Sequence, residues 1–386
     1  MSDRGWPVFR LGFRPFYLLA ACFACLAVPV WALVYAGQLA WAPNLPPMLW
    51  HAHEMVFGFA TAVIIGFLLT AGKAWTGLPT PRGLPLALLA LTWLAARVAA
   101  LLDVPYAVYA VLDLALLPIV AVILVLLLLR ADNHRNLLLA GLLGLLALAN
   151  LVFHLSVSGL LELSALRPLY AGLALIVLVE CVMAGRVVPA FTMNAIAGLR
   201  IKSRPLLDRA VLAASALALA LWVFMPAAMV TAPMLAVAAI LQAARVMSWK
   251  PLQTRGKPIL WILHLAYAWI PMGFVLLAMA QFGWVAPSAG IHAFAVGATG
   301  GLIIGMLTRT ARGHTGRPLL ASPFEVAAYT LVMLAAALRV FMPMVAPQWQ
   351  LWTALAAATA WSLAFVLYLV TFTPWLLRAR LDGKDG

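Results

Sequence analysis

Long apolar runs separated by short polar connections dominate this sequence of 386 residues. Hydrophobic residues make up 66% of the chain and charged residues 9%, whereas about 25% of residues in a soluble domain are charged. A helix that crosses a bilayer needs roughly 20 mostly apolar residues. The sequence therefore predicts a polytopic, all-α membrane helix bundle.

Charges, prolines and glycines divide the chain into twelve segments of sufficient length. We place them at 14–36, 50–72, 84–102, 104–129, 136–159, 165–188, 208–226, 229–249, 258–282, 288–310, 322–343 and 349–377. Residues 1–386 are treated as a single integral-membrane domain with membrane lipid around it. We find no convincing internal repeat.

The basic residues fall on one side of this arrangement. All but three of the 25 lysines and arginines lie in the N-terminal segment, in alternate connections or in the C-terminal tail; the exceptions are Arg97, Arg167 and Arg339. Because cytoplasmic loops attract Lys and Arg, both tails, 1–13 and 378–386, are expected in the cytoplasm. The net charge of +14 thus reflects membrane topology and not nucleic-acid binding.

Two histidines and a glutamate, His51, His53 and Glu54, open the second apolar segment. Ionisable side chains are costly in hydrocarbon, so such a cluster is a functional-site hypothesis by default. Residues two apart on a helix point about 200° apart. His51 and His53 should then face two different surroundings, unless Pro46-Pro47 keeps the segment extended. Glu54 follows His51 by three residues and shares its helix face, so it is expected to orient the His51 imidazole or to carry protons.

Five of the seven histidines lie within predicted segments. His51, His53, His154 and His292 each lie within roughly 10 Å of the non-cytoplasmic end of their helix, and His264 lies about 9 Å from the opposite end of the ninth helix. Neutral imidazole is a common metal ligand and an axial ligand of haem iron. We therefore interpret all five as candidate metal ligands, and the first four as candidate cofactor ligands. Interhelical hydrogen bonding and, for His51 and His53, an interfacial position are the alternatives.

Two arginines and a glycine-rich helix can each be interpreted either as parts of a cofactor site or as structural features. Arg97 and Arg339 are suited to pair with haem propionates, although Asp103 or Asp113 can pair with Arg97 as well. The small residues of 290–305 allow either close helix packing or the approach of a flat macrocycle. Because no Walker loop or dinucleotide-binding fingerprint is evident, ATP-driven transport is disfavoured.

Several motifs resemble those of the NnrS family of bacterial membrane proteins. They lie at Phe9–Phe16, Trp50–Phe59, Gly185–Thr192 and His292–Leu319, and the resemblance extends over nearly the whole chain. It implies a haem- and copper-containing, multi-pass protein of the bacterial inner membrane that is linked to nitric oxide metabolism and tolerance of nitrosative stress. The twelve segments and the His-X-His pair also resemble the large subunit of haem-copper oxidases, but the His-Pro-Glu-Val copper motif is absent.

The leading hypothesis is a haem and copper metalloprotein with nitric oxide as a ligand at a site near the periplasmic face. The sequence assigns it no reaction. A secondary transporter coupled to protons or metal ions, with His264 and Glu180 as a relay, is the first alternative. A factor that delivers haem or copper to a partner oxidase is the second.

Overall fold

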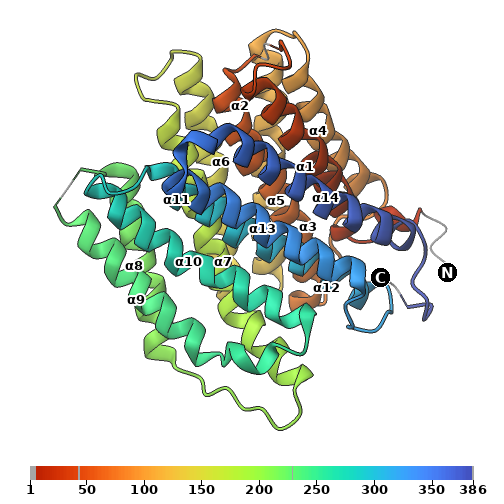
Figure 1. The fold of residues 1–386 in the computed structure, drawn as a ribbon. Coiled ribbons are helices and arrows are strands. Elements are labelled where there is room, and N and C mark those ends of the chain that lie inside the picture. The colour runs from red at the N-terminus through yellow and green to blue at the C-terminus, as the bar shows by residue number, and fades with distance from the viewer. Residues whose placement is uncertain (1–5, 42–43, 228, 385–386) are drawn as a thin grey trace. The chain divides into compact units, whose positions relative to one another are not determined.

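Every secondary-structure element that the computed structural model describes is a helix; the described residues are 6–41, 44–227 and 229–384 (Figure 1). Twelve helical stretches are long and apolar enough to cross a membrane. This confirms the all-α fold and the twelve predicted segments. The cytoplasmic orientation of the tails stays a prediction, and the parts of the tails at 1–5 and 385–386 lie outside the described residues.

The first seven of the twelve stretches begin and end close to the predicted positions, except at the end of the sixth. They are α1 (Phe13–Tyr35), Pro47–Thr76, α4 (Leu84–Leu101), α5 (Tyr106–Arg130), His134–Val157, α7 (Leu166–Ala195) and α8 (Pro205–Phe224). Pro47–Thr76 combines α2 (Pro47–His53), the π-helix η2 (Glu54–Ala60) and α3 (Thr61–Thr76), and His134–Val157 contains α6 (Leu137–Val157).

The remaining five are α9 (Thr231–Ser248), α10 (Pro258–Gln281), Pro287–His314, α13 (Pro323–Val345) and Pro347–Leu376. Pro287–His314 combines α11 (Pro287–His292), the π-helix η5 (Ala293–Gly300) and α12 (Gly301–His314), and Pro347–Leu376 contains α14 (Gln350–Leu376).

The predicted end of the sixth segment, at residue 188, is wrong. Helix α7 continues through Pro189 to Ala195. A proline inside a membrane helix is tolerated because neighbouring helices and side chains satisfy the carbonyl that it leaves free. Proline usually ends a helix in a water-soluble protein, but this rule does not hold for a helix packed within a membrane bundle.

The internal contacts of the chain group it into two compact units. Unit 1 comprises 1–172, 310–318 and 368–386, and unit 2 comprises 173–309 and 319–367. The boundary between residues 172 and 173 falls within α7, and two shorter segments later in the chain return to unit 1. The single membrane domain stays a prediction.

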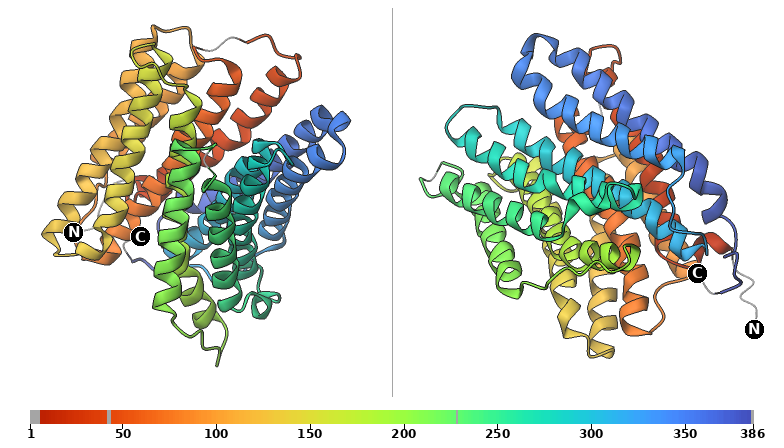
Figure 2. Two further views of the ribbon diagram at one scale, coloured as in Figure 1. Left: turned by 90° about the vertical axis from the view of Figure 1, so that its left-hand side faces the viewer. Right: turned by 60° about the horizontal axis from the view of Figure 1, so that its bottom comes forward.

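The start of the first membrane stretch and the end of the last meet in unit 1. The buried Arg14, at the start of α1, donates from Nη1 to the carbonyl oxygens of Leu376 and Arg378, at 2.8 Å each. The start of α1 and the end of α14 therefore lie side by side (Figure 2). The first span begins and the last span ends on the same side of this unit, as an even number of spans requires.

The stretches Pro47–Thr76 and Pro287–His314 share a layout that inspection of the sequence alone misses. Each begins at a proline, and in each a histidine is the last α-helical residue before a π-helix. A glycine follows this histidine after five residues, and an Ile-Ile-Gly sequence ends thirteen residues after it. One set is His53, Gly58 and Gly66, and the other is His292, Gly297 and Gly305. Unit 1 and unit 2 thus each contain one copy of a local repeat.

Candidate metal centre

A buried polar network occupies the interior of unit 1. Its side chains come from four membrane stretches and are all enclosed among apolar groups. The second stretch supplies His53 and Glu54, α4 supplies Arg97, α5 supplies Tyr109 and Asp113, and α6 supplies Asn150 and His154. Such a network requires partners for every polar group, because an unpaired one in an apolar interior is costly.

His53 is fully buried, and acceptors lie beside both of its ring nitrogens. Nδ1 lies 3.2 Å from Oε1 of Glu54 and 3.1 Å from the hydroxyl of Tyr109. Nε2 lies 2.9 Å from Oδ1 of Asn150. The imidazole stacks on Phe153 at a centroid distance of 4.5 Å. The ring is therefore held in one orientation from both edges and from one face.

Asp113 connects both histidines to the rest of the network. Its Oδ2 accepts from Nδ2 of Asn150 at 2.6 Å and lies 3.3 Å from Nε2 of His53 and 3.1 Å from Nε2 of His154. Its Oδ1 forms an ion pair with Nη2 of Arg97. Of the two readings for Arg97, pairing with Asp113 is the one that the structure shows.

The position of Arg97 depends on a glycine in the π-helix. Nη1 of Arg97 donates to Oε2 of Glu54 at 2.7 Å. A Cβ atom on Gly58 would lie 2.6 Å from that Nη1 and 3.1 Å from Oε2, closer than van der Waals contact allows. The carbonyl of Gly58 also accepts from Nε1 of Trp93 at 3.0 Å. A side chain at residue 58 would therefore displace the guanidinium from the network.

The formal charges of the network do not balance. Glu54 and Asp113 carry two negative charges, and Arg97 carries one positive charge. With both imidazoles neutral, the buried group has a net charge of −1. A buried charge is stable only when it is paired. The site therefore favours one further positive charge, which either a proton on an imidazole or a bound metal ion can supply.

The spacing of three donor atoms fits a metal ion. His53, Asp113 and His154 are all buried, and one ligand atom from each lies within 4.8 Å of the other two. A tetrahedral ion with bonds of roughly 2.0–2.1 Å has ligand atoms about 3.3 Å apart, and the two separations between the carboxylate and the imidazoles are 3.3 and 3.1 Å. The three side chains therefore form a candidate metal centre.

Groups outside these three donors support such a centre. The Nδ1 atom of His154 lies 2.8 Å from the hydroxyl of Tyr106, and Nδ1 of His53 lies beside the Glu54 carboxylate. A ligating histidine that donates its other ring N–H to such a partner is fixed in tautomer and orientation. Glu54 thus contacts the imidazole of His53, whereas the sequence predicted contact with that of His51.

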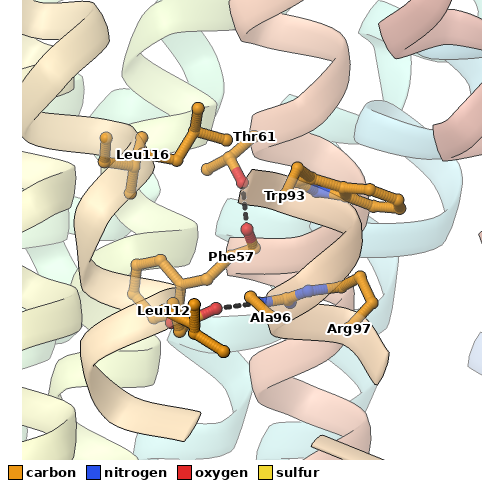
Figure 3. Close-up of a pocket in the computed structure, with 9 residues that line it drawn as sticks. Phe57, Thr61, Trp93, Ala96, Arg97, Leu112 and Leu116 are labelled. Carbon is orange, nitrogen blue, oxygen red and sulfur yellow. Dashed lines mark hydrogen bonds and ion pairs between the residues drawn. The ribbon is translucent and has the colours of Figure 1, made fainter. Parts of the chain in front are cut away.

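A small pocket adjoins the network. Asp113 and Arg97 form its polar side, and Phe57, Leu112 and Leu116 are among its apolar walls (Figure 3). The pocket gives the polar cluster one apolar neighbouring space inside the bundle. A small, weakly polar molecule is the kind of ligand that such a space favours.

His51 lies in different surroundings from His53. The helix begins at Pro47, so His51 and His53 are both helical. Their side chains therefore point about 200° apart around the helix axis, as predicted. The His51 ring stacks on Trp31 of α1 at a centroid distance of 4.1 Å. The structure therefore does not bring His51 into the cluster of His53, Asp113 and His154.

His292 belongs to unit 2. Its Nδ1 lies 2.7 Å from the carbonyl oxygen of Ser288, and Arg339 is close enough to exert an electrostatic effect on the ring. A carbonyl only accepts, so Nδ1 carries the proton and the lone pair lies on Nε2. Whether His292 shares a level with the histidines of unit 1 stays a prediction.

The glycines on either side of His292 are covered by side chains of unit 2. A Cβ on Gly290 would meet Leu277, one on Gly300 would meet Trp361, and one on Gly305 would meet Leu263. These small residues therefore admit neighbouring helices, as the packing reading requires.

His264, on α10 of unit 2, has a hydrogen-bonding partner on α7. Its Nε2 lies 2.9 Å from the hydroxyl of Thr192 on α7. Thr192 follows Glu180 by twelve residues, which is about 18 Å of helix. A direct relay between His264 and Glu180, as the transporter alternative envisages, therefore does not form.

Sequence analysis missed three members of the centre, Tyr106, Tyr109 and Asn150, and it treated Asp113 only as a partner of Arg97. A signal for them exists. Tyr106, Tyr109 and Asp113 recur at helical spacing on α5, and Asn150 precedes His154 by four residues on α6, so each set shares one helix face. Polar residues that recur on one face of a membrane helix indicate a partner across the interface.

Comparison with known proteins identifies the family. The family model described as "NnrS protein" matches residues 7–380. No curated protein matches the chain. Because the family model covers nearly all of the sequence, including the stretches that carry His53, Asp113, His154 and His292, this chain belongs to the NnrS family.

Proposed function

We propose that this protein is a haem and copper metalloprotein of the bacterial inner membrane that acts in nitric oxide metabolism or in tolerance of nitrosative stress. Membership of the NnrS family and the twelve membrane stretches support this assignment. In this proposal copper binds in unit 1 and haem binds at His292 in unit 2.

The observation that carries the copper assignment is the cluster of three buried donors. His53, Asp113 and His154 provide two imidazole nitrogens and one carboxylate oxygen with spacings suited to a metal ion. Imidazole donors suit copper, iron, zinc and nickel. The donor set therefore supports a transition metal, and the family resemblance favours copper among these.

The haem assignment depends on the open nitrogen of His292. The hydrogen bond from Nδ1 to Ser288 leaves the lone pair of Nε2 available to a metal ion. Imidazole is a common axial ligand of haem iron. The guanidinium of the nearby Arg339 is suited to a propionate. His51, stacked on Trp31, and His264, bonded to Thr192, remain proposed ligands with weaker support.

Copper and haem iron both bind nitric oxide and exchange single electrons. The residues of this chain would hold the ions, exclude water and orient the imidazoles. The apolar pocket beside Asp113 would admit a small uncharged molecule such as nitric oxide from within the bilayer.

The test is a set of spectra and metal analyses on protein purified from cells supplied with haem and copper. The proposal requires copper that is lost in His154→Ala and a Soret band that is lost in His292→Ala. His134→Ala, at an exposed histidine paired with Asp132, is the matched control and should retain both. Wild-type protein without a Soret band and without copper would exclude the proposed function.

A further inference from the structure

Glu180 is an acidic residue in the middle of a membrane helix. It lies fourteen residues after the start of α7 at Leu166 and fifteen before its end at Ala195, which corresponds to about 21 and 22 Å of helix. The hydrocarbon core is about 30 Å thick, so this carboxyl lies near its centre. An ionisable group at such a depth calls for a partner or for a function.

The structure gives Glu180 no positively charged partner. Its Oε2 is buried without a hydrogen bond, and among the described residues no arginine, lysine or histidine forms an ion pair with it. The thiol of the adjacent Cys181 is close enough to interact electrostatically with Glu180. This differs sharply from Glu54, which is paired with Arg97 at 2.7 Å.

The polar group that faces Glu180 is the hydroxyl of Thr299, from η5. Thr299 is 4% exposed. Its Oγ1 is buried, and no hydrogen bond of normal geometry joins it to Glu180 or to any other described residue. Two buried polar atoms thus face each other in unit 2, and both retain hydrogen-bonding capacity.

The free hydroxyl of Thr299 is unusual in this protein. Helical threonines here regularly donate to the carbonyl four residues earlier; they are Thr61, Thr70, Thr76, Thr92, Thr192, Thr308, Thr330 and Thr359. Thr299 lies in a π-helix, where the backbone hydrogen bonds run to the fifth residue and the carbonyls are displaced. Since Thr299 makes no such bond, its hydroxyl is available to a group outside its own helix.

The composition of the pair favours a proton over a metal ion. Glu180 and Thr299 offer one carboxylate and one hydroxyl, whereas a hard cation such as Ca²⁺ takes six to eight oxygen ligands. Among the described residues, Glu180 belongs to no group of three or more potential metal ligands. A proton needs a single carboxylate oxygen, and it removes the charge that hydrocarbon disfavours.

We propose that Glu180 is a proton-binding site within the membrane part of unit 2, with Thr299 as its hydrogen-bonding partner. The carboxyl holds a proton at neutral pH and exchanges it with its surroundings, and the free hydroxyl of Thr299 stabilises both protonation states. This site is independent of the metal centre in unit 1 and of the haem proposed at His292.

A hydrophobic carbodiimide tests this proposal on the purified full-length protein. Dicyclohexylcarbodiimide adds to protonated carboxyl groups in apolar surroundings, and the product is located by peptide mass spectrometry. Glu180 should be labelled at neutral pH, and labelling should fall about tenfold for each pH unit above its titration midpoint. Glu54, which is buried but paired with Arg97, should remain unlabelled.

Infrared spectroscopy provides a second measurement that does not depend on access of the reagent. Wild-type protein should show the C=O stretch of a protonated carboxyl group, and Glu180→Gln should lack it. Glu162→Gln, at an exposed acidic residue, should retain it. Thr299→Val should shift the band, and Thr299→Ser should return it to its original position.

Two results would overturn the proposal. One is the absence of any carboxyl band that depends on Glu180 at neutral pH, since Glu180 would then be ionised. The other is protection of Glu180 from the carbodiimide by sodium chloride but not by choline chloride, since the site would then bind a metal cation. Labelling that is insensitive to sodium, together with the Glu180-dependent band, supports it.

Discussion

His53 and His292 occupy equivalent positions in two copies of the same local structure, yet their surroundings differ. Each is the last α-helical residue before a π-helix, and each precedes a glycine by five residues. Around His53, Glu54 of the same stretch and side chains of two further helices, α5 and α6, reach the ring nitrogens. Around His292, the backbone carbonyl of Ser288 satisfies Nδ1, and no hydrogen bond to Nε2 is found among the described residues.

This comparison separates what the helix supplies from what its neighbours supply. The π-helix determines the position of the histidine and of the glycine five residues after it. That glycine leaves space for a bulky side chain from a neighbouring helix, which is Arg97 at Gly58 and Trp269 at Gly297. The neighbouring helices determine the chemistry. A charged environment suits an ion held by several protein ligands, and an open Nε2 suits a cofactor that requires one.

The largest effect is expected from Arg97→Gln. This change leaves the carboxylates of Glu54 and Asp113 buried without their cation. Breaking a buried ion pair from one side costs about 3–5 kcal/mol. We expect a large fall in the unfolding temperature of the purified protein, measured by tryptophan fluorescence on heating. Arg167→Gln, at an exposed arginine, should leave it nearly unchanged, and equal falls in the two variants would contradict the account of the network.

Asn150→Ala should weaken metal binding without removing a metal ligand. The Asn150 amide contacts both His53 and Asp113. Loss of such a supporting partner typically lowers metal affinity 10–100-fold. Competition titration with a chelator measures this change. Unaltered affinity would show that the ligands are positioned without this amide.

Gly58→Ala and Gly297→Ala sharpen the comparison directly. Both methyl groups enter filled space, against Arg97 in unit 1 and against Trp269 in unit 2, and overpacking costs about 1–3 kcal/mol. Both variants should be destabilised to a similar degree. Gly58→Ala alone should also change metal affinity in unit 1, because it displaces the guanidinium that pairs with Asp113. Reduced metal affinity in Gly297→Ala would contradict this separation of the units.

The smallest effect on stability is expected from His292→Ala. The hydrogen bond to Ser288 contributes about 0.5–1.5 kcal/mol, and no ion pair is lost. The unfolding temperature of cofactor-free protein should therefore change little, whereas His53→Ala should lower it substantially. A collapse of the His292→Ala variant would show that this ring is a packing residue.

The sequence predicts the fold well because membrane-spanning helices depend mainly on long apolar runs, which are visible residue by residue. It also predicts that His51 and His53 diverge, since this follows from helix geometry alone. The centre itself is only partly predictable. Two of its ligands, His53 and His154, are conspicuous as intramembrane histidines, but the third, Asp113, is defined by contacts among α5, α6 and the second membrane stretch.

The local repeat and the role of Gly58 are hidden for a related physical reason. A π-helix has no distinct hydrophobic period, and the space that Gly58 leaves is filled by Arg97 from a different helix. The free hydroxyl of Thr299 also lies within a π-helix. Each of these features requires knowledge of the backbone and of the neighbouring helix.

Measurement of copper per polypeptide in three variants tests the metal centre most directly. His154→Ala removes a donor of the cluster, His51→Ala removes a histidine outside it, and His292→Ala removes the histidine of unit 2. The account predicts that copper is lost in His154→Ala and retained in the other two. Copper that is retained in His154→Ala, or lost equally in all three, would contradict a metal centre formed by His53, Asp113 and His154.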